Sequence, residues 1–225
     1  MAITYHRDLV QGTQDWFDAR KGMLTASEMK LIVTPTLKVA SNDKERAHLY
    51  ELAAQRISGL IEPSYVGDDM LRGQEDEIDA RDIYRENYAP TEEVGFITND
   101  RWGFKIGYSP DGLVGDDGLI EIKSRRQKFQ IETTVKHAVP VEHVIQVQTG
   151  LLVSERRWCD FISYSAGLPM VVIRVLPDPD IQEAILTAAT SFEAKVQQTV
   201  ESYHAALKAR RYLATERRLE REMMI

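Results

Sequence analysis

The chain has 225 residues with 43% hydrophobic and 28% charged positions, which excludes a disordered or collagen-like protein and predicts one compact domain over residues 1–225. No apolar stretch approaches the ~20 residues that cross a bilayer, and a single cysteine excludes an internal disulfide or a four-cysteine iron–sulfur cluster. The net charge of −7 argues weakly against DNA binding, since a basic channel is compatible with an acidic exterior. The start of the sequence lacks a signal-peptide pattern, so we expect a cytoplasmic protein without membrane contact.

The apolar pattern predicts an α/β (α+β) protein in which helices flank a central mixed β-sheet. The predicted elements are, in chain order, helices over 14–22, 26–33, 44–60 and 70–88, a meander of short antiparallel strands over 94–124, a helix over 141–154, strands over 157–165 and 169–176, and a helical segment over 178–222. The last segment mixes basic and acidic residues, which is typical of a solvated helix face, and we assign it no catalytic role.

The end of the meander contains the residues that are best suited to chemistry. The sequence SPDG at 109–112 is followed by EIK at 121–123, and alternate residues of a strand share a face, so Glu121 and Lys123 point the same way. Two carboxylates with an ammonium suit Mg²⁺ or Mn²⁺ and the hydrolysis of a phosphodiester, because the metal polarises the phosphate and the ammonium positions water. The alternative is an ordinary surface hairpin with a solvated Glu/Lys pair.

Asp111 joins these residues only in some registers of the hairpin. A two-residue turn at Asp117-Gly118 would send Asp111 to the opposite face. We expect instead a three-residue loop with Gly118 in the left-handed conformation, which pairs Asp111 with Lys123, or a strand break at Pro110.

An anion site is predicted near the N-terminus. Thr25 and Glu28 have the spacing of a capping box, so a helix should begin at about Ala26 and place Ser27 in its first turn, where free N–H groups favour a phosphate. Arg20 lies just upstream and has bidentate geometry for phosphate. The alternative is a plain helix start with a surface arginine.

The acidic run at 71–81 has a solvated helix face as its default interpretation. Helical spacing nevertheless separates Glu75 and Asp79 from one inward stripe that includes Glu77. A carboxylate on a buried stripe needs a partner, and a metal or its water is a suitable one. The stripe consists of Met70, Gly73, Glu77, Ala80, Tyr84 and Tyr88.

These blocks together resemble a known family. The residues PD at 110–111 and EIK at 121–123 resemble the PD-(D/E)xK nuclease signature, and the form SPDG…ExK is similar to the phage lambda exonuclease and YqaJ-type viral recombinase group over about residues 12–175. The resemblance implies a restriction-endonuclease-like core and a glutamine near the scissile phosphate, for which alignment order selects Gln146; a helical wheel leaves Gln148, or a structural role for both, as alternatives. The implied roles are metal binding by Asp111, Glu121 and Glu77, water activation by Lys123, and binding of a 5′-terminal phosphate by Arg20 and Ser27.

The resemblance also implies an activity and partners. We expect a Mg²⁺-dependent exonuclease that degrades one strand of duplex DNA 5′→3′, releases 5′-mononucleotides and leaves a 3′ overhang for a single-strand annealing protein. The family assembles as ring-shaped homotrimers, in which only the channel has to be positive. The alternatives are a PD-(D/E)xK endonuclease and an inactive protein that binds DNA ends. The run at 123–128 is the best local basic patch beside the expected site, although each cation taken singly is more simply a solvated surface residue.

Overall fold

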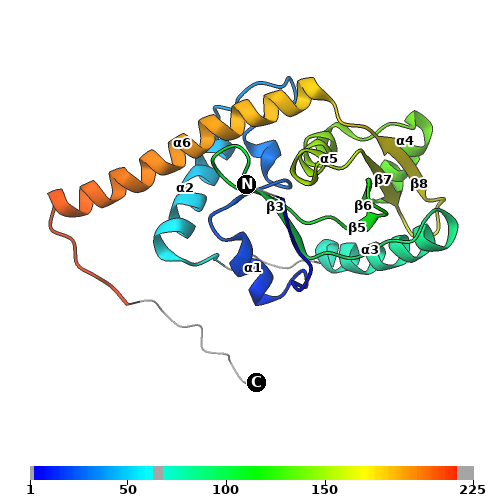
Figure 1. The fold of residues 1–225 in the computed structure, drawn as a ribbon, viewed down its shortest axis with the longest axis horizontal. Coiled ribbons are helices and arrows are strands. Elements are labelled where there is room, and N and C mark those ends of the chain that lie inside the picture. The colour runs from blue at the N-terminus through cyan, green and yellow to red at the C-terminus, as the bar shows by residue number, and fades with distance from the viewer. Residues whose placement is uncertain (1–2, 63–67, 217–225) are drawn as a thin grey trace.

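The computed structural model describes residues 3–62 and 68–216, and its strands form two four-stranded mixed sheets (Figure 1). The first sheet has the order β1 (Ile3–His6), β3 (Phe96–Asn99), β4 (Ile106–Tyr108) and β2 (Leu24–Thr25). The second has the order β5 (Gly112–Val114), β6 (Gly118–Ser124), β7 (Trp158–Tyr164) and β8 (Val171–Val175). The predicted class is confirmed, but there are two sheets where one was expected.

The predicted meander over 94–124 is wrong at its middle. The strands β3 and β4 pair in one sheet, whereas β5 and β6 pair in the other, so the chain changes sheets at residues 109–111. Pro110 lies at this change, and a proline cannot donate a hydrogen bond to a strand ladder. The strand break that was one of the two expectations for Pro110 is therefore present.

Six α-helices surround the sheets among the described residues. They are α1 (Gln14–Arg20), α2 (Asp43–Ser58), α3 (Asp68–Asn87), α4 (Gln127–Lys136), α5 (Val141–Ser154) and α6 (Pro179–Ala209). The α2 helix begins after Asn42, whose side chain accepts from the N–H groups of Lys44 and Glu45, and it ends at Gly59, which has the left-handed φ of 67°. The α5 helix has the predicted bounds.

Two helix predictions fail for physical reasons. The helix expected over 26–33 is only a 3-10 turn, η1 (Met29–Leu31), because Thr25 belongs to β2 and its hydroxyl donates to the Glu28 carboxylate at 2.5 Å instead of capping a backbone N–H group. The α4 helix was not predicted, since its buried residues are polar: the amide of Gln130 donates to the carbonyl of Ser163 and accepts from its hydroxyl.

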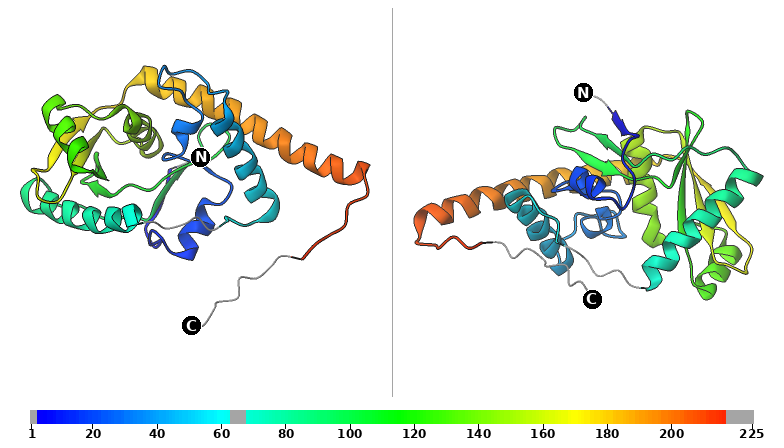
Figure 2. Two further views of the ribbon diagram at one scale, coloured as in Figure 1. Left: turned by 180° about the vertical axis from the view of Figure 1, so that it is seen from behind. Right: turned by 90° about the horizontal axis from the view of Figure 1, so that it is seen from below.

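The long C-terminal helix packs on the body only along its first part. Its buried residues lie between Ile185 and Val196, and Figure 2 shows its far end extending away from the rest of the molecule. Residues 210–216 are not helical, and residues 217–222 of the predicted segment lie outside the described residues. Among the helices described, none is both long and apolar enough to cross a membrane.

The α5 helix lies against both sheets and fixes their relative position near Tyr108. It contacts β3 and β4 of the first sheet and β7 of the second. A Cβ atom at Gly150 would lie 2.6 Å from Cζ of the Tyr108 ring. The small-residue face of this helix is therefore filled by a tyrosine from β4.

We expect Gly150→Ala to lower the free energy of unfolding by about 1–3 kcal/mol, because the added methyl group overpacks the Tyr108 ring. Gly73→Ala in α3 is the matched control, since its Cβ would meet no described atom within 4 Å and alanine is the better helix former by up to about 1 kcal/mol. Denaturant titration of both variants measures the difference. Equal stability of the two would show that the Tyr108 ring yields without cost.

Candidate active site

The hairpin register places Asp111 beside Glu121. The strands β5 and β6 pair Gly112 with Ile120 and Val114 with Gly118, and this register, continued by one residue, sets Asp111 opposite Glu121. The loop has three residues, as predicted, but it spans 115–117 and its left-handed glycine is Gly115, with φ of 50°. The expected pairing of Asp111 with Lys123 is thus wrong by two positions.

Gly118 has a different role from the predicted one. A Cβ atom at this position would lie 2.2 Å from the Trp158 ring on the neighbouring strand β7. The glycine is needed for this close approach, so it belongs to the strand and the left-handed turn moves to Gly115.

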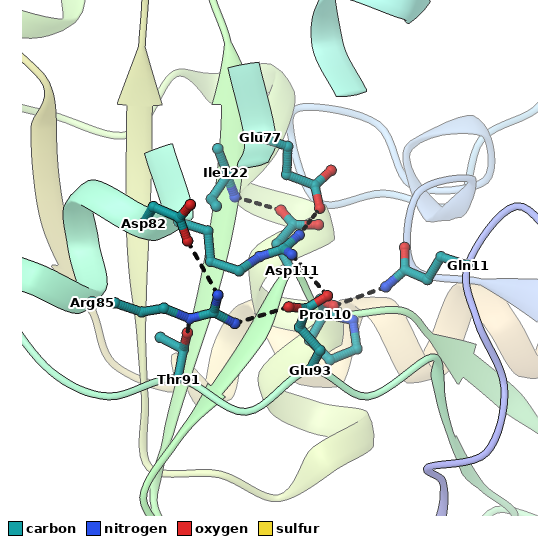
Figure 3. Close-up of polar contacts among 10 residues, drawn as sticks. Gln11, Glu77, Asp82, Arg85, Thr91, Glu93, Pro110, Asp111 and Ile122 are labelled. Atoms are coloured by element: carbon teal, nitrogen blue, oxygen red, sulfur yellow. Dashed lines mark hydrogen bonds and ion pairs between the residues drawn. The ribbon is translucent and has the colours of Figure 1, made fainter. Parts of the chain in front are cut away.

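Asp111 is a buried carboxylate fixed by the backbone. Its Oδ2 accepts a hydrogen bond of 2.5 Å from the N–H group of Ile122 in β6. The preceding residue is also held, because the Gln11 side chain donates to the carbonyl of Pro110 at 3.0 Å (Figure 3). The carboxylate therefore has one orientation relative to β6.

Glu121 lies at the centre of the site and is 1% exposed. Its carboxylate accepts three hydrogen bonds: from the Tyr108 hydroxyl at 2.8 Å, from Lys123 Nζ at 2.6 Å and from Gln146 Nε2 at 2.5 Å. These donors come from β4, β6 and α5. Both sheets and one helix thus meet at a single buried carboxylate.

The two glutamines of α5 are now distinguished by position. Gln146 contacts Glu121, whereas Gln148 donates to the carbonyl of Leu176 and accepts from the N–H group of Asp178. Gln148 therefore ties α5 to the segment that leads into α6. Only Gln146 lies in the candidate site.

Glu77 approaches the site from α3. Figure 3 shows its carboxylate beside that of Asp111. Its partner is Arg81, one turn along the helix, which also pairs with Glu93 at 2.9 Å. The sequence predicted an inward stripe with a metal as partner, and the structure adds an arginine.

The other residues of the predicted α3 stripe agree only in part with the burial that was expected of them. Ala80 and Tyr84 are buried, and Glu75 and Asp79 on the other side are exposed, as expected. Tyr88 at the end of the stripe is exposed, contrary to the expectation. The Met70 side chain lies outside the part of the chain that is described.

The charges of the site act strongly on one another. Burial, followed by the charges of Glu121 and Glu77, raises the pKa of Asp111 well above its ordinary value. Burial also raises the pKa of Glu77, although Arg81 opposes this. Burial alone would lower the pKa of Lys123, but the carboxylates, Glu121 first, outweigh it and raise that pKa, so the lysine stays protonated.

This arrangement fits a magnesium ion held by two protein carboxylates. Among the described residues, no three His, Cys, Asp or Glu side chains are close enough to hold a metal without other ligands. Mg²⁺ typically takes one or two carboxylates and completes its shell with water and phosphate oxygens. The buried pair Asp111 and Glu121 meets that requirement, and Glu77, paired with Arg81, lies beside it.

A second group of polar residues is suited to an anion. The guanidinium of Arg20 lies 4.1 Å from the Trp16 ring and donates to the Ser109 hydroxyl at 3.2 Å. The Trp16 indole also donates to this hydroxyl, at 3.0 Å, so the hydroxyl proton of Ser109 remains for an acceptor such as a phosphate oxygen. Burial lowers the pKa of Arg20, with Glu28 acting in the opposite direction.

Ser27 joins this group in a different way from the predicted one. It is exposed and follows β2, not a helix N-terminus, because only the three-residue turn η1 comes after it. The strands β2 and β4 run parallel with Thr25 beside Gly107, so Ser27 and Ser109 leave the sheet at the same end. The anion group therefore consists of Arg20, Ser109 and Ser27.

Sequence reasoning missed three residues of the site, namely Tyr108, Ser109 and Arg81. Ser109 and Tyr108 directly precede the PD dipeptide, so proximity to it was an available signal. Arg81 follows Glu77 by four residues, the spacing of a helical ion pair, which was also visible.

We expect Asp111→Asn to raise the free energy of unfolding by about 0.5–2 kcal/mol in metal-free buffer. Folding raises the pKa of Asp111, so its ionised form costs stability at neutral pH, and an amide still accepts from the Ile122 N–H group. Denaturant titration in the presence of a chelator measures the change. A loss of stability would show that the clustered charges are already compensated.

The matched control is Asp160→Asn. Asp160 is also buried but has favourable partners, since Arg174 binds it with two contacts of 2.8 Å and the Tyr84 hydroxyl donates to it at 2.6 Å. Its replacement should lower the free energy of unfolding by about 1–3 kcal/mol. The two variants should therefore differ in sign.

The chain is similar to one known protein family and to several solved structures. The family model described as the YqaJ-like viral recombinase domain matches residues 15–157. No curated protein matches the chain. Among solved structures, the alkaline exonuclease LHK-Exo from Laribacter hongkongensis is 32% identical with a TM-score of 0.78, covering 88% of this chain and 99% of that one.

Two further structures agree with this result. LHK-Exo in complex with dAMP is 34% identical with a TM-score of 0.79, covering 88% of this chain and 100% of that one. A phage related exonuclease from Haemophilus somnus 129PT shares the fold alone, at 11% identity and a TM-score of 0.58 over 80% of this chain and 96% of that one. The buried carboxylates, the lysine beside them and these likenesses lead to one conclusion: this chain belongs to the YqaJ-like viral recombinase family and is a nuclease of DNA recombination.

Proposed function

We propose that the protein is a Mg²⁺-dependent exonuclease that degrades one strand of duplex DNA 5′→3′ and releases 5′-mononucleotides. One observation carries the proposal: the anion group at Ser109 and the carboxylate of Asp111 are separated by a single residue. A terminal phosphate held at Ser109 brings the adjoining phosphodiester to the carboxylates. An arginine and hydroxyls that are suited to a terminal phosphate, held this close to the carboxylates, favour cleavage at a strand end over cleavage without end preference.

Different residues bind the DNA end and promote the hydrolysis. Arg20 and Ser109, with Ser27 at the same sheet end, bind the 5′-terminal phosphate by charge-assisted hydrogen bonds. Lys123 orients the attacking water and stabilises the charge that develops on the phosphate oxygens. Gln146 and Tyr108 keep the Glu121 carboxylate in one orientation.

Asp111 and Glu121 would hold Mg²⁺, or Mn²⁺ in its place, and Glu77 beside them would complete the shell through a metal-bound water. When bound, the metal polarises the phosphate and lowers the pKa of coordinated water. The like charge of the three carboxylates supports this assignment, because a divalent cation relieves their repulsion.

The relatives support the same activity. LHK-Exo is described as an alkaline exonuclease, and one of its structures contains dAMP, a mononucleotide of the kind that this reaction releases. By the family resemblance, the remaining strand forms a 3′ overhang for a single-strand annealing protein, and the chain acts as a homotrimeric ring around duplex DNA. In such a ring only the surface of the channel has to be positive, which is compatible with the net charge of −7.

Three DNA substrates test the proposal: linear duplex with 5′-phosphate ends, linear duplex with 5′-hydroxyl ends, and covalently closed circles. In Mg²⁺ we expect mononucleotides from phosphorylated linear DNA, slower release from hydroxyl ends and no cutting of circles. Lys123→Ala should lower the rate by at least about 100-fold, the usual effect of removing one group that stabilises the transition-state charge. Arg20→Ala should remove most of the preference for the 5′-phosphate.

The other outcomes are decisive. Cutting of circles would make the protein an endonuclease with the same carboxylates. Binding of DNA ends with no Mg²⁺-dependent hydrolysis would make it an accessory that holds ends without cleaving them.

Metal binding is tested separately from catalysis by thermal unfolding. We expect Mg²⁺ to raise the melting temperature by about 2–4 °C for each kcal/mol of binding free energy in wild type and in Asp160→Asn, but hardly at all in Asp111→Asn. Equal shifts in the three proteins would place the metal away from Asp111.

A further inference from the structure

Two cations, one from the turn after β6 and one from the first turn of α4, lie over one exposed aromatic ring. The guanidinium carbon of Arg125 lies 5.1 Å from the centre of the Phe129 ring, and Lys128 Nζ lies 4.7 Å from it. The Phe129 side chain is nevertheless 39% exposed. An exposed aromatic ring beside cations is the combination with which proteins bind unpaired nucleotides.

Arg125 is the most constrained member of this group. Its side chain is 10% exposed, and its backbone N–H group donates to the carbonyl of Tyr164, so the strand pairing with β7 continues past Ser124. The Nη1 atom lies 3.1 Å from a carboxylate oxygen of Glu142 and 3.0 Å from Nε2 of His143. In the described part of the molecule, the Nε atom of Arg125 has no hydrogen-bond partner.

These contacts leave Arg125 able to bind an incoming anion. A buried guanidinium nitrogen without an acceptor is costly, and a phosphate oxygen satisfies it in the forked geometry of arginine. Burial, with Lys123 and Arg125, lowers the pKa of His143 to about 4, so this ring is neutral and accepts from Arg125. Glu142 is the only carboxylate contacting Arg125 among the described residues, and because it is exposed its pairing is weak enough for a phosphate to compete.

The group continues the same face of the structure as the catalytic residues. Lys123 and Arg125 are two residues apart on an extended strand, so they share a face at about 7 Å. That step is comparable to the one between neighbouring phosphates of a nucleic-acid strand. On α5, His143 lies one turn before Gln146, which contacts Glu121.

We propose that Arg125, Lys128 and Phe129 form a subsite for the nucleotide next to the cleaved phosphodiester. The two cations bind its phosphate and the exposed side of the Phe129 ring stacks on its base. A ring stacks on a base only after that base has left its neighbour, so the subsite takes an unpaired nucleotide at the duplex end. The inference rests on the proposed nuclease function and adds to it the form of the DNA that is held.

Equilibrium binding of a fluorescent 5′-phosphorylated hairpin DNA with a short unpaired 5′ end tests the subsite. The parent protein is Lys123→Ala, which should degrade the probe at least about 100-fold more slowly than wild type. Arg125→Ala in this parent should weaken binding and lower the slope of log K against log salt by about one, the change expected for one lost phosphate contact. Phe129→Leu should weaken binding about five-fold or more, the lower end for one stacked base, with the slope unchanged.

Arg157→Ala is the matched control. This variant also removes one arginine, whose ion pair with Asp117 is exposed. Arg157 lies beside the start of β6, at the opposite end of the strand from Arg125. Affinity and salt slope like those of the parent are expected for it. A fully paired hairpin should lose the effect of Phe129→Leu.

The subsite is overturned if Arg125→Ala and Arg157→Ala give the same salt slope, or if Phe129→Leu binds the unpaired end as tightly as the parent. Thermal unfolding shows whether each variant is folded. If Arg125→Ala does not fold, the exposed Phe129 position decides the question alone. Failure of the Lys123→Ala parent to bind any DNA would instead contradict the proposed nuclease function, so the two failures are distinguishable.

Discussion

The burial of the Glu121 carboxylate is the constraint on which the rest of the site depends. A buried charge is tolerated only when hydrogen-bond donors surround it, and here the donors come from β4, β6 and α5. Tyr108 belongs to one sheet and Glu121 to the other, so this carboxylate fixes how the sheets meet. Gly150 is part of the same requirement, because only a residue without a side chain lets α5 approach the Tyr108 ring.

The repulsion among the carboxylates of the site lowers the stability of the fold, and packing of the surrounding core has to compensate for it. Asp111, Glu121 and Glu77 repel one another, whereas the carboxylate of Asp160, on the neighbouring strand, is neutralised by Arg174. The first arrangement stores unfavourable electrostatic energy at the proposed cation and phosphate site, and the second only stabilises the fold. This contrast between two buried aspartates supports a functional assignment independently of the family likeness.

Sequence patterns predicted the helices and strands that are determined by neighbouring residues. They failed where contacts with residues distant in sequence determine the structure. The span of α5 and the strand carrying Glu121 and Lys123 follow from apolar spacing. The turn at Gly115 does not, because Gly118 is required by Trp158, which is distant in sequence. The α4 helix escaped prediction for a similar reason, since its inward face is polar and is satisfied by a strand that comes later in the chain.

The change of sheets at residues 109–111 has a mechanical consequence. Ser109 and Asp111 are joined by Pro110 alone, whose ring fixes one backbone angle and whose carbonyl is held by Gln11. Sliding of one sheet against the other moves Tyr108 or Gln146 relative to Glu121, but it changes the spacing between Ser109 and Asp111 only through the one free backbone angle of Pro110. The covalent chain itself therefore sets the distance between the hydroxyl that would bind a phosphate and the carboxylate that would bind a metal. This distance depends little on motions of the surrounding fold.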